Sequence, residues 1–111
     1  MTTIYSNVVT LSVSSEQVTY YLSLSFSPTS FNSSGGTATA TATLTANVSN
    51  VNLSGYNVTL NQLASASTSA TVLNSWQGTT DSNGNATFTV SIPTNTSTST
   101  VYYYFDAVAT V

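Results

Sequence analysis

Apolar and polar residues alternate with a period of two along most of the chain, a pattern typical of β-strands that bury only one face. The alternation is clearest in residues 18–26 and 37–49, and in the second segment small apolar side chains from Ala38 to Val48 occupy most alternate positions. Helical periodicity is nearly absent. The pattern predicts strands at residues 18–26, 37–49, 56–60, 86–92 and 100–111, with a weaker strand near residues 68–74.

Clusters of turn-forming residues separate the predicted strands. These clusters lie at residues 27–28, 34–36, 54–55, 81–84 and 93–99. Short strands that each have one apolar face favour two antiparallel sheets packed face to face, as in a β-sandwich. The alanines of the second strand leave room for larger rings, for which the candidates are Phe26, Trp76, Phe88 and Phe105.

Ionisable side chains are almost absent from the sequence. It contains no Lys, Arg, His or Cys, and its only side-chain carboxylates belong to Glu16, Asp81 and Asp106. Without cations, the chain lacks the groups that neutralise nucleic-acid phosphates or attract an anionic membrane surface. Without His, Cys or Lys, it lacks the usual zinc ligands and the usual base for a serine nucleophile. We therefore expect no enzymatic activity, no cofactor or metal, and no nucleic-acid partner.

The rest of the composition bears on location. Ser, Thr and Asn make up about half of the 111 residues, whereas charged residues make up 3%. Typical soluble domains carry about 25% charged residues, so the composition predicts an extracellular or cell-surface protein. No apolar stretch approaches the roughly 20 residues that a membrane-spanning helix needs, and no membrane insertion is expected. Since few groups titrate, stability is predicted to change little between about pH 2 and pH 7.

Five segments carry a family resemblance, and the most specific is the polar turn and following strand at residues 79–90. The others are residues 24–30, 36–44, 55–60 and 105–111. Together they resemble a bacterial immunoglobulin-like domain of the type found in invasin and intimin stalks. The resemblance implies an immunoglobulin-like antiparallel β-sandwich with a structural role, as a spacer, a stiffening element or a display module. It also implies that the domain has no catalytic residues. The chain departs from the family by lacking lysine and by having an additional N-terminal strand. The predicted organisation is an N-terminal strand at residues 1–16 and an immunoglobulin-like domain at residues 17–111.

The additional N-terminal strand lies outside the resemblance, between Ile4 and Val13. Its candidate assembly residues are Ile4, Tyr5, Val8, Val9, Leu11 and Val13. In one interpretation the strand folds back through residues 14–17 and pairs with its own domain. In the other it is donated to a neighbouring subunit, whose sandwich it completes by β-strand addition. Head-to-tail donation propagates as a filament. The sequence leaves both interpretations open.

The last predicted strand has apolar side chains on both faces. Its outward face contains the interface candidates Tyr102, Tyr104 and Val108. Large exposed apolar side chains often indicate an interface, and an uncovered edge of this kind tends to aggregate. A neighbouring subunit is one way of covering it.

The segment Asp81-Ser-Asn-Gly-Asn85 has two interpretations. Its oxygen-bearing side chains suggest a calcium loop, but the loop lacks the glycine and distal glutamate of the known calcium-binding pattern. The alternative is a hairpin turn, in which Asn83 and Gly84 supply the positive φ angles of a tight connection. We favour the turn and expect no metal.

Six N-glycosylation sequons occur in the chain. They begin at Asn32, Asn47, Asn52, Asn57, Asn85 and Asn95. Each falls in a predicted loop or on the polar face of a predicted strand, so all six are expected to be exposed and to be candidates for N-linked glycans.

The leading hypothesis is a structural subunit of an extracellular filament or pilus that polymerises with identical subunits. The composition resembles that of archaeal surface filament proteins, which are glycosylated and poor in charge. One alternative is a virion protein, such as a tail fibre or a capsid decoration. Another is an adhesin or carbohydrate-binding module, in which Trp76, beside Asn74 and Gln77, stacks on sugars instead of packing in a core or an interface.

Overall fold

Six β-strands, and no helix, make up the secondary structure of the residues that this computed structural model describes, which are 1–15 and 17–111. The strands are β1 (Tyr20–Ser27), β2 (Gly36–Ala46), β3 (Asn57–Leu63), β4 (Val72–Thr79), β5 (Asn85–Ile92) and β6 (Tyr104–Thr110). They form two three-stranded sheets, with the orders β1-β2-β5 and β4-β3-β6. All four pairings are antiparallel. The all-β prediction is therefore confirmed.

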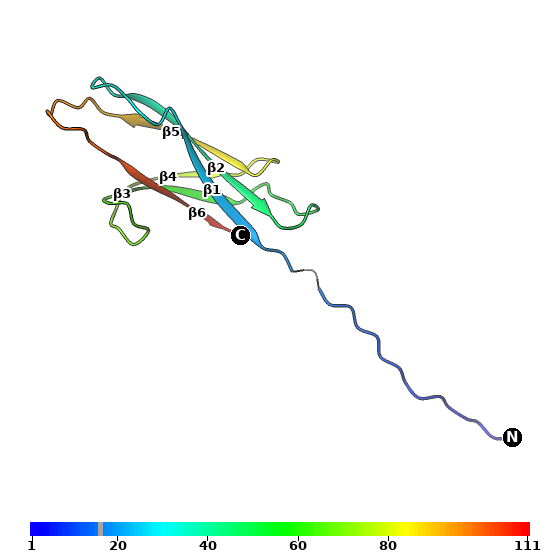
Figure 1. Cartoon of the computed structure of the whole chain (residues 1–111). Helices are drawn as coiled ribbons and strands as arrows, with labels where there is room; N and C mark the ends of the chain where they lie inside the picture. The colour runs from blue at the N-terminus through cyan, green and yellow to red at the C-terminus, as the bar shows by residue number, and fades with distance from the viewer. Residues whose placement is uncertain (16) are drawn as a thin grey trace.

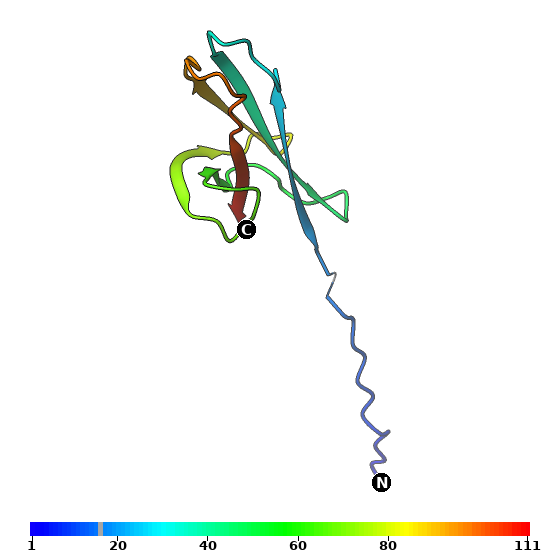
Figure 2. The same cartoon turned by 60° about the vertical axis from the view of Figure 1, so that its left-hand side comes forward.

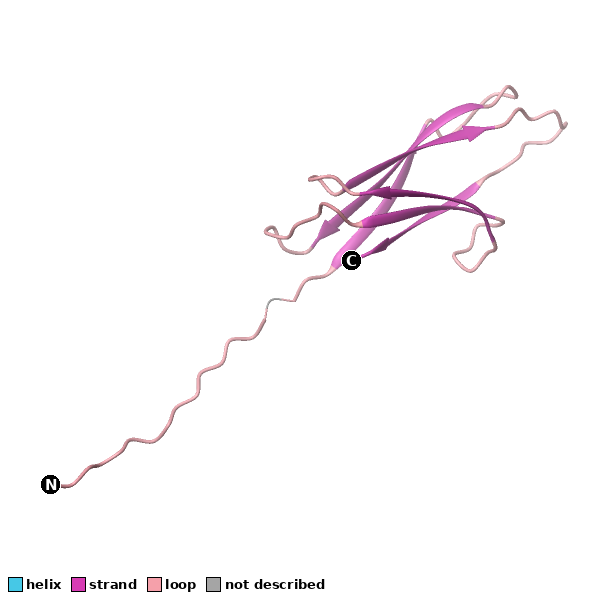
Figure 3. Cartoon of the chain, turned by 180° about the vertical axis from the view of Figure 1, so that it is seen from behind, coloured by secondary structure: helices cyan, strands magenta, loops and turns pink. Residues whose placement is uncertain are grey.

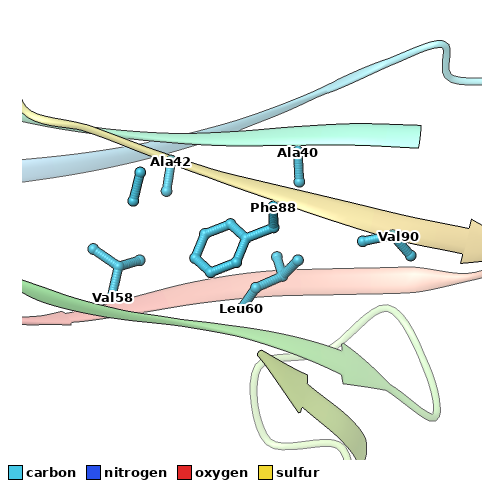
Figure 4. Packing of buried hydrophobic residues seen from close by; sticks show 7 residues of the cluster. Ala40, Ala42, Val58, Leu60, Phe88 and Val90 are labelled. Carbon is cyan, nitrogen blue, oxygen red and sulfur yellow. The ribbon is translucent and has the colours of Figure 1, made fainter. Parts of the chain in front are cut away.

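The two sheets pack against each other through a small apolar core (Figure 4). Ala40 on β2 lies beside Phe88 on β5 in the sheet register, so the small alanine side chain leaves space for the phenyl ring. Val58 and Leu60 on β3 meet this cluster from the facing sheet and are fully buried. The sequence alternation of β2 thus determines which of its residues enter the core.

Two strands differ from their predicted positions. The weak strand expected near residues 68–74 corresponds to β4, which lies further along the chain, at Val72–Thr79. Its position places Trp76 opposite Leu60, with the indole ring packed against the core. The final strand was expected from Thr100 but begins at Tyr104. Its neighbour β3 ends at Leu63, the register partner of Tyr104, so residues 100–103 have no adjacent strand among the described residues.

The N-terminal segment, residues 1–15, extends away from the two sheets and continues the line of β1 (Figures 1 and 2). The molecule measures 101 × 28 × 18 Å, and its radius of gyration is 23.6 Å. A compact domain of about 100 residues has a radius of gyration of about 13 Å, so the projecting segment dominates the shape. We call residues 1–15 the arm.

Candidate functional site

The arm presents its apolar side chains to solvent. The predicted assembly residues Ile4, Tyr5, Val8, Val9, Leu11 and Val13 are between 71% and 97% exposed. The arm is extended and pairs with no strand among the described residues (Figure 3). The predicted fold-back through residues 14–17 is absent from the described residues of this structure; Glu16 lies outside them. An extended apolar segment without a partner has the chemistry of a strand to be added to another sheet.

The segment between the arm and β1 is attached to the rest of the domain by Asn47, directly after β2. The Asn47 side-chain oxygen accepts a hydrogen bond of 2.8 Å from the Thr19 amide, and its Nδ2 donates one of 3.3 Å to the Gln17 carbonyl. The Asn47 amide also donates to the Thr19 carbonyl at 3.0 Å. These bonds continue the β1–β2 pairing as far as Gln17 and keep residues 17–19 in line with β1. The sequence indicated Asn47 only as a sequon.

The core is less completely covered along one side of the sandwich. On β5, the inward residues Ala86, Phe88 and Val90 are buried. On β1, at the other edge of the same sheet, the inward residues Leu22, Leu24 and Phe26 are only half-buried. The inward residues of β6 are half-buried as well: Phe105, Ala107 and Ala109. Trp76 on β4 is half-buried too, but only on the side where β1 faces β6 are most inward residues of both described edge strands half-buried, and we call this the open side.

Two adjoining hollows lie on this open side, and we call them together the β1–β6 groove. One has a volume of about 610 Å³ and reaches the core-facing residues Ala38 and Ile92. The other, of about 720 Å³, lies over Leu24 and Leu63. Both hollows are lined by Phe26, Thr29, Tyr103 and Phe105. The Phe26 and Phe105 rings lie 4.8 Å apart between their centroids, so the groove has an aromatic floor. The groove could not be predicted from the sequence, because its residues come from distant segments.

Of the interface candidates, Tyr102 and Tyr104 line the groove and Val108 does not. Tyr102 is 70% exposed, Val108 is 52% exposed and Tyr104 is 37% exposed. Tyr104 and Val108 lie on β6, whose free edge borders the groove. The exposed side chains expected there are thus adjacent to an unpaired strand edge, to which another strand can pair.

The segment between Asp81 and Asn85 is a turn, but it is not a hairpin. It joins β4 in one sheet to β5 in the other. The Leu44 amide donates a 2.7 Å hydrogen bond to the Gly84 carbonyl. This bond lies next to the Thr43–Asn85 pair and holds the end of the turn against β2, where β5 begins. Gly84 has a φ of 81°, whereas no described residue other than glycine has a positive φ. The expectation that Asn83 shares this conformation is therefore wrong.

The Asp81 carboxylate accepts hydrogen bonds from backbone amides within this turn. The amides of Asn83 and Asn85 both donate to its Oδ1, at 2.9 and 3.0 Å. No group of three or more His, Cys, Asp or Glu side chains that could hold a metal ion occurs among residues 1–15 and 17–111. The same residues include no helix with the length and hydropathy needed to cross a membrane.

Four of the six sequon asparagines are exposed: Asn32, Asn47, Asn52 and Asn57. The expectation that all six are exposed is wrong for Asn85 and Asn95, which are half-buried. The Asn85 side-chain oxygen accepts a 2.9 Å hydrogen bond from the Thr43 hydroxyl across the sheet. The Asn95 Nδ2 donates to the Ser99 carbonyl at 2.9 Å. Both amides are thus engaged in local structure.

Trp76 is not an open platform for a sugar. Its side chain is half-buried and packs against the core cluster. The indole lies 6.2 Å from the Phe105 ring between centroids, at an interplanar angle of 43°. This geometry is that of an aromatic pair inside a fold, and it disfavours the sugar-stacking interpretation.

Two tyrosines meet edge to face near the base of the arm. The rings of Tyr20 and Tyr56 lie 6.0 Å apart between centroids, at an interplanar angle of 61°. A hydrogen bond with the Tyr56 side chain, reinforced by partial loss of solvent, raises the pKa of the Tyr20 phenol above its ordinary value. The pair links the first residue of β1 to the segment that precedes β3.

Comparison of the chain with protein-family models, curated proteins and solved structures found no match.

Proposed function

We propose that this chain is a structural subunit of an extracellular filament or pilus, built from an immunoglobulin-like sandwich. In the assembly, the arm of each subunit completes the sandwich of the next subunit. One observation carries the proposal: an extended apolar arm without a partner occurs in the same chain as a sandwich whose β1–β6 side is open.

The energetics favour bringing the arm and the groove together. Burying one Val, Leu or Ile side chain stabilises a structure by about 1.5–3 kcal/mol. The arm has several such side chains in solvent, and Tyr5 adds an aromatic ring. An added strand also pairs the backbone groups of a free sheet edge. Since these gains are made together, each subunit has a strong tendency to bind the arm of another.

The direction of the arm favours a neighbouring subunit over the arm's own domain. Asn47 holds Gln17 and Thr19 in line with β1, and the arm extends outward in the same direction (Figure 1). Reaching its own groove would require the chain to reverse close to this attachment. Reaching a second subunit requires no reversal. Such head-to-tail contacts use two different surfaces and therefore repeat without closing.

The composition suits an exposed polymer. The outward residues of β2 are threonines, at every second position from Thr37 to Thr45. Their hydroxyl groups give this face a polar, uncharged surface that water can hydrogen-bond. The exposed sequon asparagines Asn32, Asn52 and Asn57 provide positions at which N-linked glycans would disturb neither the core nor the Asn47 hydrogen bonds. These features support a location outside the cell, with glycans as partners of the filament surface.

The proposal is tested by placing charges on one face of the arm. Val9→Asp together with Leu11→Asp should abolish assembly, because a buried, unpaired carboxylate is strongly unfavourable. The matched control is Thr10→Asp with Ser12→Asp, which adds the same charge to the alternate face. Electron microscopy and sedimentation of the purified proteins measure the outcome. Filaments from the parent and the control, but not from the Val9/Leu11 variant, support the proposal. A parent protein that remains monomeric at all concentrations contradicts it.

A further inference from the structure

We infer that the arm of a second copy binds along the edge of β6, antiparallel to it, and that residues 100–103 become a continuation of β6 when it binds. The inference rests on the proposed function and specifies the receiving edge, the direction and the register. The occupant is residues 5–13 of an identical chain.

The β6 edge is favoured by the segment that precedes it. Residues 100–103 have no strand on either side, yet the alternation of β6 continues through them, with Val101 and Tyr103 in phase with Phe105. All three line the first hollow of the groove. A strand added along β6 would give the backbone of residues 100–103 its missing partner. On the opposite border of the groove, β1 ends at Ser27 and is followed by Pro28, which has no amide to donate.

The direction follows from the position of the chain ends. β6 runs toward the end of the sandwich at which β1 starts (Figures 1 and 2), so the two strands run in opposite directions. The arm runs in the same direction as β1, because it continues the line of that strand. If the next subunit has the same orientation, its arm therefore enters the groove antiparallel to β6. An inverted subunit would enter parallel to β6, and two copies would then close on each other as a dimer. Antiparallel pairing is slightly more stable per residue, which favours the open assembly.

The register follows from the apolar patterns of the two segments. Directly opposed residues in an antiparallel pair share a face, so the inward residues of the arm must oppose the inward residues of β6 and its extension. Placing Val9 opposite Phe105 pairs all five inward positions of each segment. The resulting inward pairs are Val13 with Val101, Leu11 with Tyr103, Val9 with Phe105, Asn7 with Ala107, and Tyr5 with Ala109. In this register the largest arm side chain, Tyr5, lies opposite a small alanine.

The test uses engineered disulfides in the full-length chain, which has no cysteine of its own. Ser12→Cys with Tyr102→Cys joins outward positions that are directly opposed in the antiparallel register. Ser12→Cys with Thr110→Cys joins positions that approach each other only if the arm runs parallel to β6. Filaments of each variant are oxidised with diamide and then examined by denaturing electrophoresis and electron microscopy.

We expect a ladder of covalent oligomers from the Ser12/Tyr102 variant and none from the Ser12/Thr110 variant. A ladder or a covalent dimer from the Ser12/Thr110 variant would overturn the antiparallel direction. Filaments in which neither pair links would overturn the edge and register while leaving the proposed function intact. An internally linked monomer from the Ser12/Thr110 variant, without filaments, would overturn both proposals, because the arm would then occupy its own groove.

Discussion

Gly84 and Gly55 both adopt the left-handed conformation, with φ angles of 81° and 85°, but their surroundings differ. A side chain at Gly84 would meet the carbonyl oxygen of Leu44, whereas one at Gly55 would meet nothing within 4 Å. We predict that Gly55→Val costs about 1–2 kcal/mol from the backbone conformation alone. Gly84→Val should cost at least about 1 kcal/mol more, because the β2 backbone must move. Urea denaturation of both variants measures the difference, and equal costs would contradict the close approach.

Tyr20 provides a pH-dependent probe of the strand that leads to the arm. Its pKa is raised by the hydrogen bond with Tyr56, so the folded protein holds this proton more tightly than the unfolded chain does. The associated stability is fully present below the unfolded value of about 10 and is lost as the pH rises through the folded pKa. Tyr20→Phe should therefore lose less stability than the parent as the pH rises above about 10.

Melting temperatures across this alkaline range check the Tyr20 prediction. Tyr21→Phe is the matched control, because Tyr21 is exposed on the other face of β1. Parent and control should show the same alkaline decline. An equally steep decline in Tyr20→Phe would mean that the Tyr20–Tyr56 pair does not contribute to it.

The arm acts as a separate element, and a peptide copy of it should compete with it. A peptide of residues 1–15, added while the full-length protein assembles from denaturant, should fill grooves without offering a groove of its own. Mean filament length, measured by electron microscopy, should fall as the peptide concentration rises. The same peptide with Val9→Asp and Leu11→Asp is the control and should have no effect. Filaments of unchanged length with the unmodified peptide would show that the groove is not its binding site.

The strands could be predicted wherever alternation alone defines them. The strict small–polar alternation of β2 identified both its position and its buried face. β4 was misplaced because residues 64–71 are small and polar and do not distinguish strand from loop. The start of β6 depends on where its neighbour β3 ends, which is a property of the sheet and not of the local sequence. For the same reason, the apolar positions of the arm were visible in the sequence, whereas the groove and the Asn47 attachment were not.

At the scale of the whole molecule, the register determines the spacing of an assembly. Val9 of one subunit lies opposite Phe105 of the next, and Phe105 contacts Phe26 on β1. Neighbouring subunits are therefore displaced by the axial distance between residues 9 and 26 of one chain. Seventeen residues at about 3.3 Å each give an axial repeat of about 56 Å when the chain is straight. Power spectra of filament images should show a repeat near this value, and a clearly shorter repeat in filaments with a straight arm would exclude the register.

The location of residues 5–13 in the assembled protein shows directly whether the arm of one subunit occupies the groove of the next. A structure of the filament by electron cryo-microscopy should show Val9 and Leu11 in the β1–β6 groove of a neighbouring subunit. The density should be unbroken from Ser12 to β1 of the donating subunit. A structure in which Val9 and Leu11 pack within their own subunit would contradict the account. The contacts between subunits would then have to be sought on the exposed face that includes Tyr102 and Tyr104.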